Sequence, residues 1–304
     1  MNASQRAQGP WPGEESQTLS GASPSFASLR EVEERLGSAI ENDELNLPIL
    51  PDVVAKVLAA AGDEKTDAKK LAELVRCDPT VAAHVLRVTN SPLYRGSSPI
   101  VSLQHAVARL GTSRLRDVLL LVARQTTSFF VRARAEALRD DFRAAVVSAL
   151  FAQEIARLRR SNVEDAFLGG LLHDVGRPIV LQELLDIAHE LDVTLPAPVE
   201  KRMLDDTHAI AGAKMVEAWK LPGELALVVR HHHSPAAAGP AMKAAAVVAL
   251  ADACTRFALG RKDVMPAKAN TGNPLLQMLD LYPDDLLALV ARSEELIELA
   301  GGLV

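Results

Sequence analysis

Four places in the second half of the chain put histidine or aspartate where helical spacing predicts burial. They are His173-Asp174, His208, the run His231-His232-His233, and Asp252. A buried charge without a partner is costly, so these groups are either neutralised by hydrogen bonds or hold an ion. Asp252 argues most strongly for an ion, because we expect no lysine or arginine inside its apolar run.

Each of these groups also has a plain structural interpretation. A single histidine on an apolar helix face is usually a hydrogen-bonded core residue, and we assign His84, His105 and His189 to that class. The three consecutive histidines suit a polar helix end, where the negative end of the dipole stabilises a cation. Taken together, the four places favour a divalent metal, because imidazole and carboxylate ligands suit zinc, iron, manganese or nickel.

The His173-Asp174 pair poses a geometric problem, because neighbours on a regular helix point about 100° apart. Glycines flank the pair at Gly169-Gly170 and Gly176. They permit close approach of other helices and a helix break just after the pair. Asp174 would then offer one oxygen to each of two ions.

Helical periodicity runs from about residue 27 to the C-terminus, and no segment has convincing strand alternation. Asp78 and Asn162 are the expected N-caps of two helices, Thr66 or Asp67 of a third, and Gly111 the expected end of a fourth. A long helix is predicted over about 136–158. Two separate helices are predicted for VEKRMLDD and HAIAGAKMVEAWK, which puts His208 in a first turn. The fold class is all-α.

Composition narrows the range of functions. The net charge of −6 argues against a general nucleic-acid binder. The two cysteines, Cys77 and Cys254, lie far apart and suggest a reducing compartment. With no secretory signal and no apolar run long enough for a membrane helix, we expect a cytoplasmic protein. Residues 1–26 are rich in Ser, Gly, Pro and Gln, and we expect a disordered tail.

Arginines gather between Arg109 and Arg143, where eight arginines and four acids leave a surplus of four positive charges. We interpret this stretch as a solvated helix face. A docking patch for an acidic partner, or for nucleic acid, is the weaker alternative.

The order of several motifs resembles the HDOD branch of the HD superfamily of metal-dependent phosphohydrolases. In the first half these are LPILPDVVAKVL, LVRCDPTVAAHVLRVTNSPLY and PIVSLQHAVARLGTSRLRDVLLL. In the second half they are AFLGGLLHDVGRPIV, THAIAGAKMVEAWKLP, VVRHHHSP and VVALADA. The resemblance begins at Leu47 and implies a bilobed helical HDOD domain over 27–304. Its N-terminal lobe would cover about 27–134, and its HD-like lobe about 135–304.

In hydrolytic members of the superfamily, a metal lies among a first histidine, the His-Asp pair, later histidines and a late aspartate. The resemblance implies one or two divalent ions (Fe, Mn, Zn or Ni) and these ligands: His173, Asp174, His208, His232, His233 and Asp252. The alignment puts Ala144 in place of the first histidine, and alanine cannot bind a metal. The glycine-tyrosine-proline signature of the cyclic di-GMP phosphodiesterase branch is also absent, and Arg177 stands where that branch has lysine.

Two functions remain. HDOD proteins resemble degenerate relatives that act as signalling outputs, which implies a non-catalytic bacterial regulator. It would bind a signalling protein, or a nucleotide or cyclic dinucleotide. The alternative is a metal-dependent phosphohydrolase acting on a nucleotide or cyclic dinucleotide, with Asp174 as a catalytic residue that orients a metal-bound water. We favour the regulator because of Ala144, and we expect no membrane partner.

Overall fold

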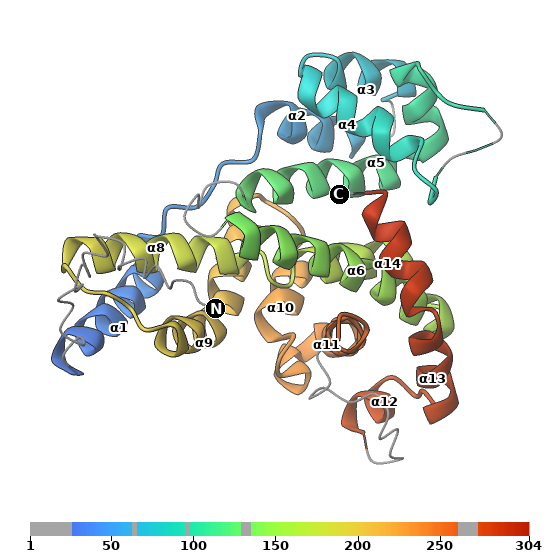
Figure 1. The fold of residues 1–304 in the computed structure, drawn as a ribbon. Helices are drawn as coiled ribbons and strands as arrows, with labels where there is room; N and C mark the ends of the chain where they lie inside the picture. Colours follow the sequence, from blue (N-terminus) through green and yellow to red (C-terminus); the bar gives the residue numbers. More distant parts are fainter. Residues whose placement is uncertain are drawn as a thin grey trace, which may run out of the picture.

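The structure is a computed structural model that describes residues 26–62, 66–94, 96, 98–128, 135–260 and 273–303. Within these ranges all regular secondary structure is helical, which confirms the all-α prediction (Figure 1). The predicted disordered tail falls outside the described residues except for Phe26, where α1 begins.

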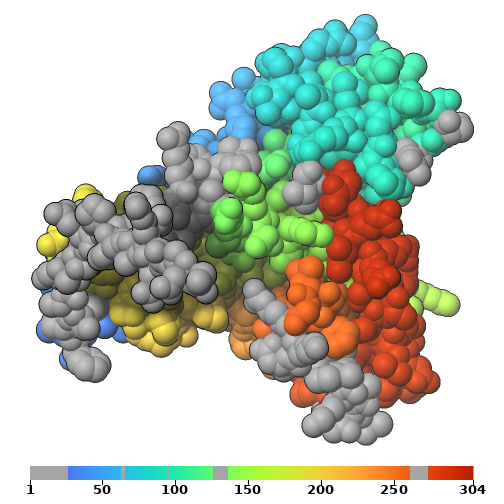
Figure 2. Space-filling model, viewed as in Figure 1, coloured from blue at the N-terminus to red at the C-terminus, as the bar shows by residue number. Residues whose placement is uncertain are grey.

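The N-terminal lobe contains α2 (Asp52–Ala61), α3 (Ala68–Val75), α4 (Pro79–Thr89) and the first part of α5 (Leu103–Ser128). The Asp78 carboxylate accepts hydrogen bonds from the backbone N–H groups of Thr80 and Val81, at 2.8 and 3.1 Å, so it caps α4 as predicted. Gly111 has φ of 72°, a conformation that favours glycine, and it breaks α5 where the sequence predicted a helix end. Figure 2 shows this lobe standing out from the larger body of the protein.

The HD-like lobe is built around α6, which packs against α7 and α11, while α8 packs along α9. The second part of α5 joins this lobe through α6, α7 and α8. The helices of the lobe are α6 (Ala135–Arg159), α7 (Val163–Leu172), α8 (Gly176–Glu190), α9 (Ala197–Ala218), α10 (Gly223–His231), η2 (Pro235–Ala241), α11 (Met242–Ala258), α12 (Pro274–Met278), α13 (Pro283–Ala291) and α14 (Ser293–Gly301).

Helix α1 (Phe26–Glu41) lies away from the N-terminal lobe to which the sequence assigned it. It packs on α8 and α9, and the Arg202 guanidinium on α9 donates two hydrogen bonds of 3.0 Å to the Glu33 carboxylate (Figure 1). The extended chain after α1 is held by the Trp219 indole N–H, which donates to the Pro48 carbonyl at 2.9 Å. The N-terminal lobe therefore begins near α2. In the sequence it stands between α1, which packs on the HD-like lobe, and the remaining helices of that lobe.

Helix α9 is one continuous helix of 22 residues, so the two separate helices predicted for this region are wrong. The polar residues that suggested a cap serve other contacts. The Thr207 hydroxyl donates to the Met203 carbonyl at 2.6 Å, and Asp205 accepts from Arg177 at 3.1 Å and from Lys201. His208 therefore lies in the middle of a helix, where its backbone is fixed on both sides.

One helical stretch, Pro235–Ala258, is long and apolar enough to cross a membrane by length and composition, although the sequence analysis expected none. Half of its apolar window is buried inside the fold, as in the core helix of a folded protein. Gly239, with φ of 56°, breaks the stretch within η2, before α11 begins at Met242.

Candidate metal site

The His-Asp pair lies in a sharp turn between α7 and α8. The Asn162 side chain caps α7 by accepting from the backbone N–H groups of Glu164 and Asp165, at 3.0 and 3.2 Å. A Cβ atom added at Gly170 would lie 2.7 Å from the Ala149 Cα on α6, and one at Gly176 would lie 2.0 Å from the His208 carbonyl oxygen. Glycine at these two positions lets α6 and α9 approach the turn closely.

Three buried histidines share one orientation. The Nδ1 atoms of His173, His208 and His232 lie 2.8, 2.7 and 2.7 Å from the carbonyl oxygens of residues 170, 204 and 229. A carbonyl only accepts, so each Nδ1 carries a proton, and a ring that is neutral keeps its lone pair on Nε2. Backbone carbonyls fix the tautomer of metal-binding histidines in the same way.

These lone pairs converge on Asp174. Its Oδ1 lies 3.1 Å from the Nε2 of His208 and 3.6 Å from the Nε2 of His232. The Nε2 of His233 lies 3.0 Å from that of His208. Candidate ligand atoms of Asp174, His208, His232 and His233 all lie within 4.8 Å of one another. The structure thus brings four of the six predicted ligands into one cluster.

The other two predicted ligands, His173 and Asp252, lie beside this cluster. The Nε2 of His173 is 3.6 Å from Oδ2 of Asp174 and 3.9 Å from Oδ1 of Asp252. The other oxygen of Asp252 lies 3.0 Å from the guanidinium of Arg256, one turn further along α11. The expectation that Asp252 has no nearby cation is therefore wrong, and part of its charge is neutralised without a metal.

Burial and mutual contact shift the pKa values within the cluster in opposite directions. Burial opposes ionisation of Asp174, but the charges of His173 and His208 and the hydrogen bond from His208 outweigh it and hold the pKa of this carboxyl well below its usual range. Asp174 in turn raises the pKa of His208 against the effect of burial, whereas burial and the neighbouring rings of His232 and His208 lower the pKa of His233 to about 3. Metal binding would release the proton that His208 shares with Asp174, because the ligands must be an ionised carboxylate and neutral imidazoles.

The donor set fits a single divalent ion of the zinc, iron, manganese or nickel type, since it combines imidazole nitrogen with one carboxylate. The Nε2 atom of His232 is buried and has no hydrogen-bond partner among the described residues, which is costly unless another group satisfies it. Two ligand atoms on opposite sides of an ion, each about 2.1 Å from it, are about 4.2 Å apart. The candidate ligand atoms lie within 4.8 Å of one another, so the most distant pair must move slightly closer when an ion binds. An ion bound here would lower the pKa of a bound water, and its positive charge would stabilise a phosphate group.

Two arginines near the cluster were not predicted to lie there. Arg124 was assigned to a solvated face, but its side chain is 1% exposed and its Nε donates to the Leu171 carbonyl at 3.2 Å. Arg177, considered only as a lysine replacement, binds Asp205 at 3.1 Å and lies 3.5 Å from Asp141. The apolar run LLLVA directly before Arg124 was the signal that it is buried.

The histidines assigned to the core behave in different ways. His84 is buried, and its Nδ1 lies 2.8 Å from the Arg87 guanidinium, while burial lowers the pKa of the ring to about 4. His105 and His189 are exposed, so their assignment as core residues is wrong.

Comparison with known proteins places this arrangement in a family. The HDOD domain family matches residues 47–235, which is more than half of the chain. The chain belongs to the HDOD domain family. No curated protein matches the sequence of this HDOD protein.

Solved structures share the fold of this HDOD protein at low sequence identity. A candidate metal-dependent phosphohydrolase from Shewanella amazonensis SB2B has a TM-score of 0.70 at 20% identity, covering 90% of this chain and 99% of its own. An HDOD domain protein with unknown function from Geobacter sulfurreducens has a TM-score of 0.62 at 23% identity, covering 87% and 99%. A candidate signal transduction protein from Marinobacter aquaeolei VT8 has a TM-score of 0.66 at 23% identity, covering 91% and 66%.

Proposed function

We propose that this HDOD protein is a non-catalytic signalling module that holds one divalent ion. The supporting observation is that the two sides of Asp174 differ in the number of metal ligands they offer. Asp174, His208, His232 and His233 form a complete four-donor set. On the other side of Asp174, the described residues offer His173 and Asp252, and Arg256 already neutralises part of the charge of Asp252. A site for one ion is therefore supported better than a two-metal hydrolytic centre.

The side of Asp174 that holds His173 and Asp252 lacks a further ligand because position 144 is alanine. Ala144 lies on α6 one turn after Asp141, and residues three apart share a helix face. Asp141 lies 3.5 Å from Arg177, which follows the His-Asp pair closely in sequence, so this face of α6 is turned towards the candidate site. A histidine at position 144 would supply the fourth donor for a second ion.

The proposed output is binding of a signalling protein partner in the cytoplasm of a bacterium, with no membrane or nucleic acid involved. The likeness to the candidate signal transduction protein supports a signalling role. A nucleotide or cyclic dinucleotide remains the second class of ligand for the cluster.

Metal content tests the proposal directly. Untagged protein purified without chelator is analysed by mass spectrometry beside Asp174→Ala and a control, Asp140→Ala, which removes an exposed aspartate from α6. We expect one ion per chain in the wild type and the control, and none in Asp174→Ala. No metal in any of the three would overturn the proposed site.

A second measurement decides between regulator and hydrolase. Wild type, Asp174→Ala and Ala144→His are assayed with Mn²⁺ against bis(p-nitrophenyl) phosphate, nucleotides and cyclic dinucleotides. We expect no turnover above Asp174→Ala for the wild type, and a rise from one ion to two in Ala144→His. Wild-type turnover that is lost in Asp174→Ala would establish the metal-dependent phosphohydrolase instead.

A further inference from the structure

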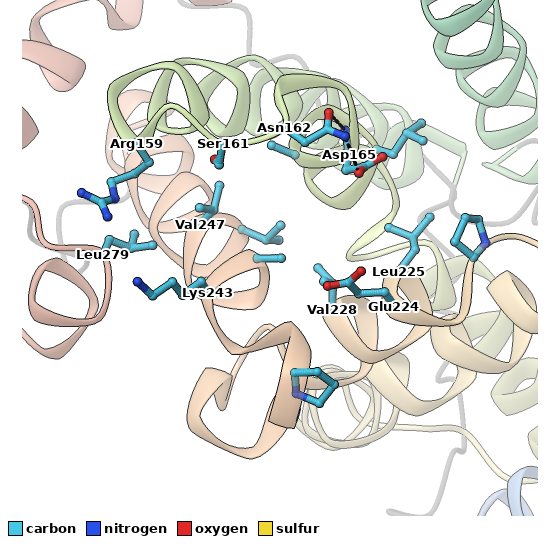
Figure 3. A pocket seen from close by; sticks show the side chains of 16 residues that line it. Arg159, Ser161, Asn162, Asp165, Glu224, Leu225, Val228, Lys243, Val247 and Leu279 are labelled. Atoms are coloured by element: carbon cyan, nitrogen blue, oxygen red, sulfur yellow. Dashed lines mark hydrogen bonds between the residues drawn. The ribbon is translucent and has the colours of Figure 1, made fainter.

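A cavity of about 480 Å³ opens among α7, α10 and α11, closed at one end by the last turn of α6 and by Leu279. Its walls are mainly apolar side chains, including Leu168, Leu225, Val228 and Val247. Figure 3 shows the side chains of Leu225, Val228 and Val247 pointing into a common space. Cavities of roughly 300–1,000 Å³ with apolar walls and a few polar groups are typical small-molecule sites.

The cavity lies one helical turn from the candidate metal site on the same helices. Val228 on α10 precedes His232 by four residues, and Val248 on α11 precedes Asp252 by four. Between them lies Gly169 of α7, where an added Cβ would be 2.8 Å from a Val248 methyl and 3.3 Å from a Val228 methyl. A tightly packed layer of valine methyl groups therefore separates the cavity from the His-Asp cluster.

The charged groups at the rim are sorted by sign. At one end, the Arg159 guanidinium lies 2.9 Å and the Lys243 amine 3.6 Å from the same Asp280 oxygen, so two cations share one carboxylate. Asp165 and Glu224 lie at the other end, on the opposite side of the apolar floor (Figure 3). Among the described residues, these ion pairs leave one positive charge in excess at the first end.

This pattern specifies the chemistry of a ligand. We propose that the cavity binds a small amphiphilic acid, with its single acidic group at Arg159 and Lys243 and its apolar body across Val228 and Val248. A polyanion such as a nucleotide is disfavoured, because its polar body would meet apolar walls and the far end carries carboxylates.

Because the cavity lies close to the candidate metal site, its ligand would act as the input signal of the proposed signalling module. The apolar body would contact Val228 of α10, and the metal would bind His232 at the end of the same helix. If α10 couples the two sites, each ligand alters the binding free energy of the other by the same amount. This coupling rests on the proposed metal site, whereas ligand binding to the cavity does not.

Isothermal titration of the full chain with decanoate, below its micelle-forming concentration, tests the cavity. Ala244→Phe fills the exposed mouth of the cavity, and Lys243→Glu reverses the charge at the acidic-group end. The matched controls are Ala55→Phe and Lys69→Glu, at exposed positions on α2 and α3 of the N-terminal lobe.

We expect one decanoate per chain, binding at least about tenfold weaker in both cavity variants, which is a loss of about 1.4 kcal/mol. Binding should be unchanged in both controls, and dodecyltrimethylammonium should not bind. Absent or non-saturable decanoate binding would overturn the proposal and make an apolar side chain of a partner protein the occupant to test. Equal binding in Ala244→Phe, or equal binding of the cationic amphiphile, would also overturn it.

The two proposals fail separately. Asp174→Ala should lose metal yet bind decanoate, and Ala244→Phe should lose decanoate binding yet keep its metal. Coupling predicts that decanoate affinity changes on metal removal in the wild type and not in Asp174→Ala. Equal affinity with and without bound metal would overturn the input role and leave the cavity site standing.

Discussion

The pH dependence of stability should be governed in part by Asp117, a buried carboxyl group on α5. Asp117 is 1% exposed, and in the part of the chain that the structure describes neither carboxylate oxygen has a hydrogen-bond partner. Burial raises its pKa to about 7, while Arg116 opposes the shift and Glu164 adds to it. A neutral isostere, Asp117→Asn, removes the ionisation and keeps the shape.

The size and sign of the effect follow from the two states of the carboxyl. The pKa moves from 3.8 to about 7 on folding, which is about three units, and each unit is worth about 1.36 kcal/mol, so the native state bears a penalty of about 4 kcal/mol. Below pH 3.8 both states are protonated and there is no penalty. As the pH rises towards about 7 only the unfolded state ionises, so stability falls, and above this pH the loss is complete.

Urea unfolding followed by circular dichroism at pH 4, 6 and 8 measures this difference, with Asp140→Asn as the control for an exposed carboxylate. Asp117→Asn should be more stable than the wild type at pH 8 by up to about 4 kcal/mol, and the gap should shrink to near zero by about pH 4. A gap that is the same at all three pH values, or a variant less stable than wild type at pH 8, would refute the assignment of a buried, protonated carboxyl.

Three further predictions concern packing, hydrogen bonding and metal. Gly176→Ala places a Cβ 2.0 Å from the His208 carbonyl oxygen and should destabilise the fold by more than about 3 kcal/mol in the same urea titration. Its control is Gly37→Ala in the middle of α1, where the added Cβ meets open space and should stabilise the fold by about 0.5–1 kcal/mol. Asn90→Ala removes side-chain bonds of 2.7 Å to both the N–H and the carbonyl of Ile100, and should lower the free energy of unfolding by about 2–3 kcal/mol. Saturating Zn²⁺ or Mn²⁺ should raise the Tm of the wild type, and His232→Ala should reduce that rise; an equal rise in both would exclude His232 as a ligand.

Local chemistry was readable from the sequence where one or two residues decide it. Asp78 and Asn162 were predicted as caps and are caps, because an Asx side chain before a helix satisfies the first N–H groups wherever the helix goes. The pairing of Asp252 with Arg256 was also readable, since residues four apart share a helix face, but the apolar run around them hid it.

Other features depend on contacts between distant segments. The position of α1 on α8 and α9 depends on apolar surfaces more than a hundred residues apart, which periodicity cannot pair. The converging Nε2 atoms of the histidines depend on the backbone carbonyls at 170, 204 and 229, whose directions are known only once the helices are packed. The burial of Arg124 likewise depends on how α5 lies against α7.

The placement of α1 has a consequence for synthesis on the ribosome. Its buried residues Val32 and Leu36 belong to the core, yet one of its ion-pair partners, Arg202, follows Glu33 by 169 residues. At about 5–20 residues per second, α1 waits roughly ten to thirty seconds for that surface to be translated. The N-terminal lobe can assemble meanwhile from helices that are neighbours in sequence. Helix α1 leaves the ribosome before the helices of the N-terminal lobe but docks after them, and its exposed apolar face gives chaperones an early segment to bind.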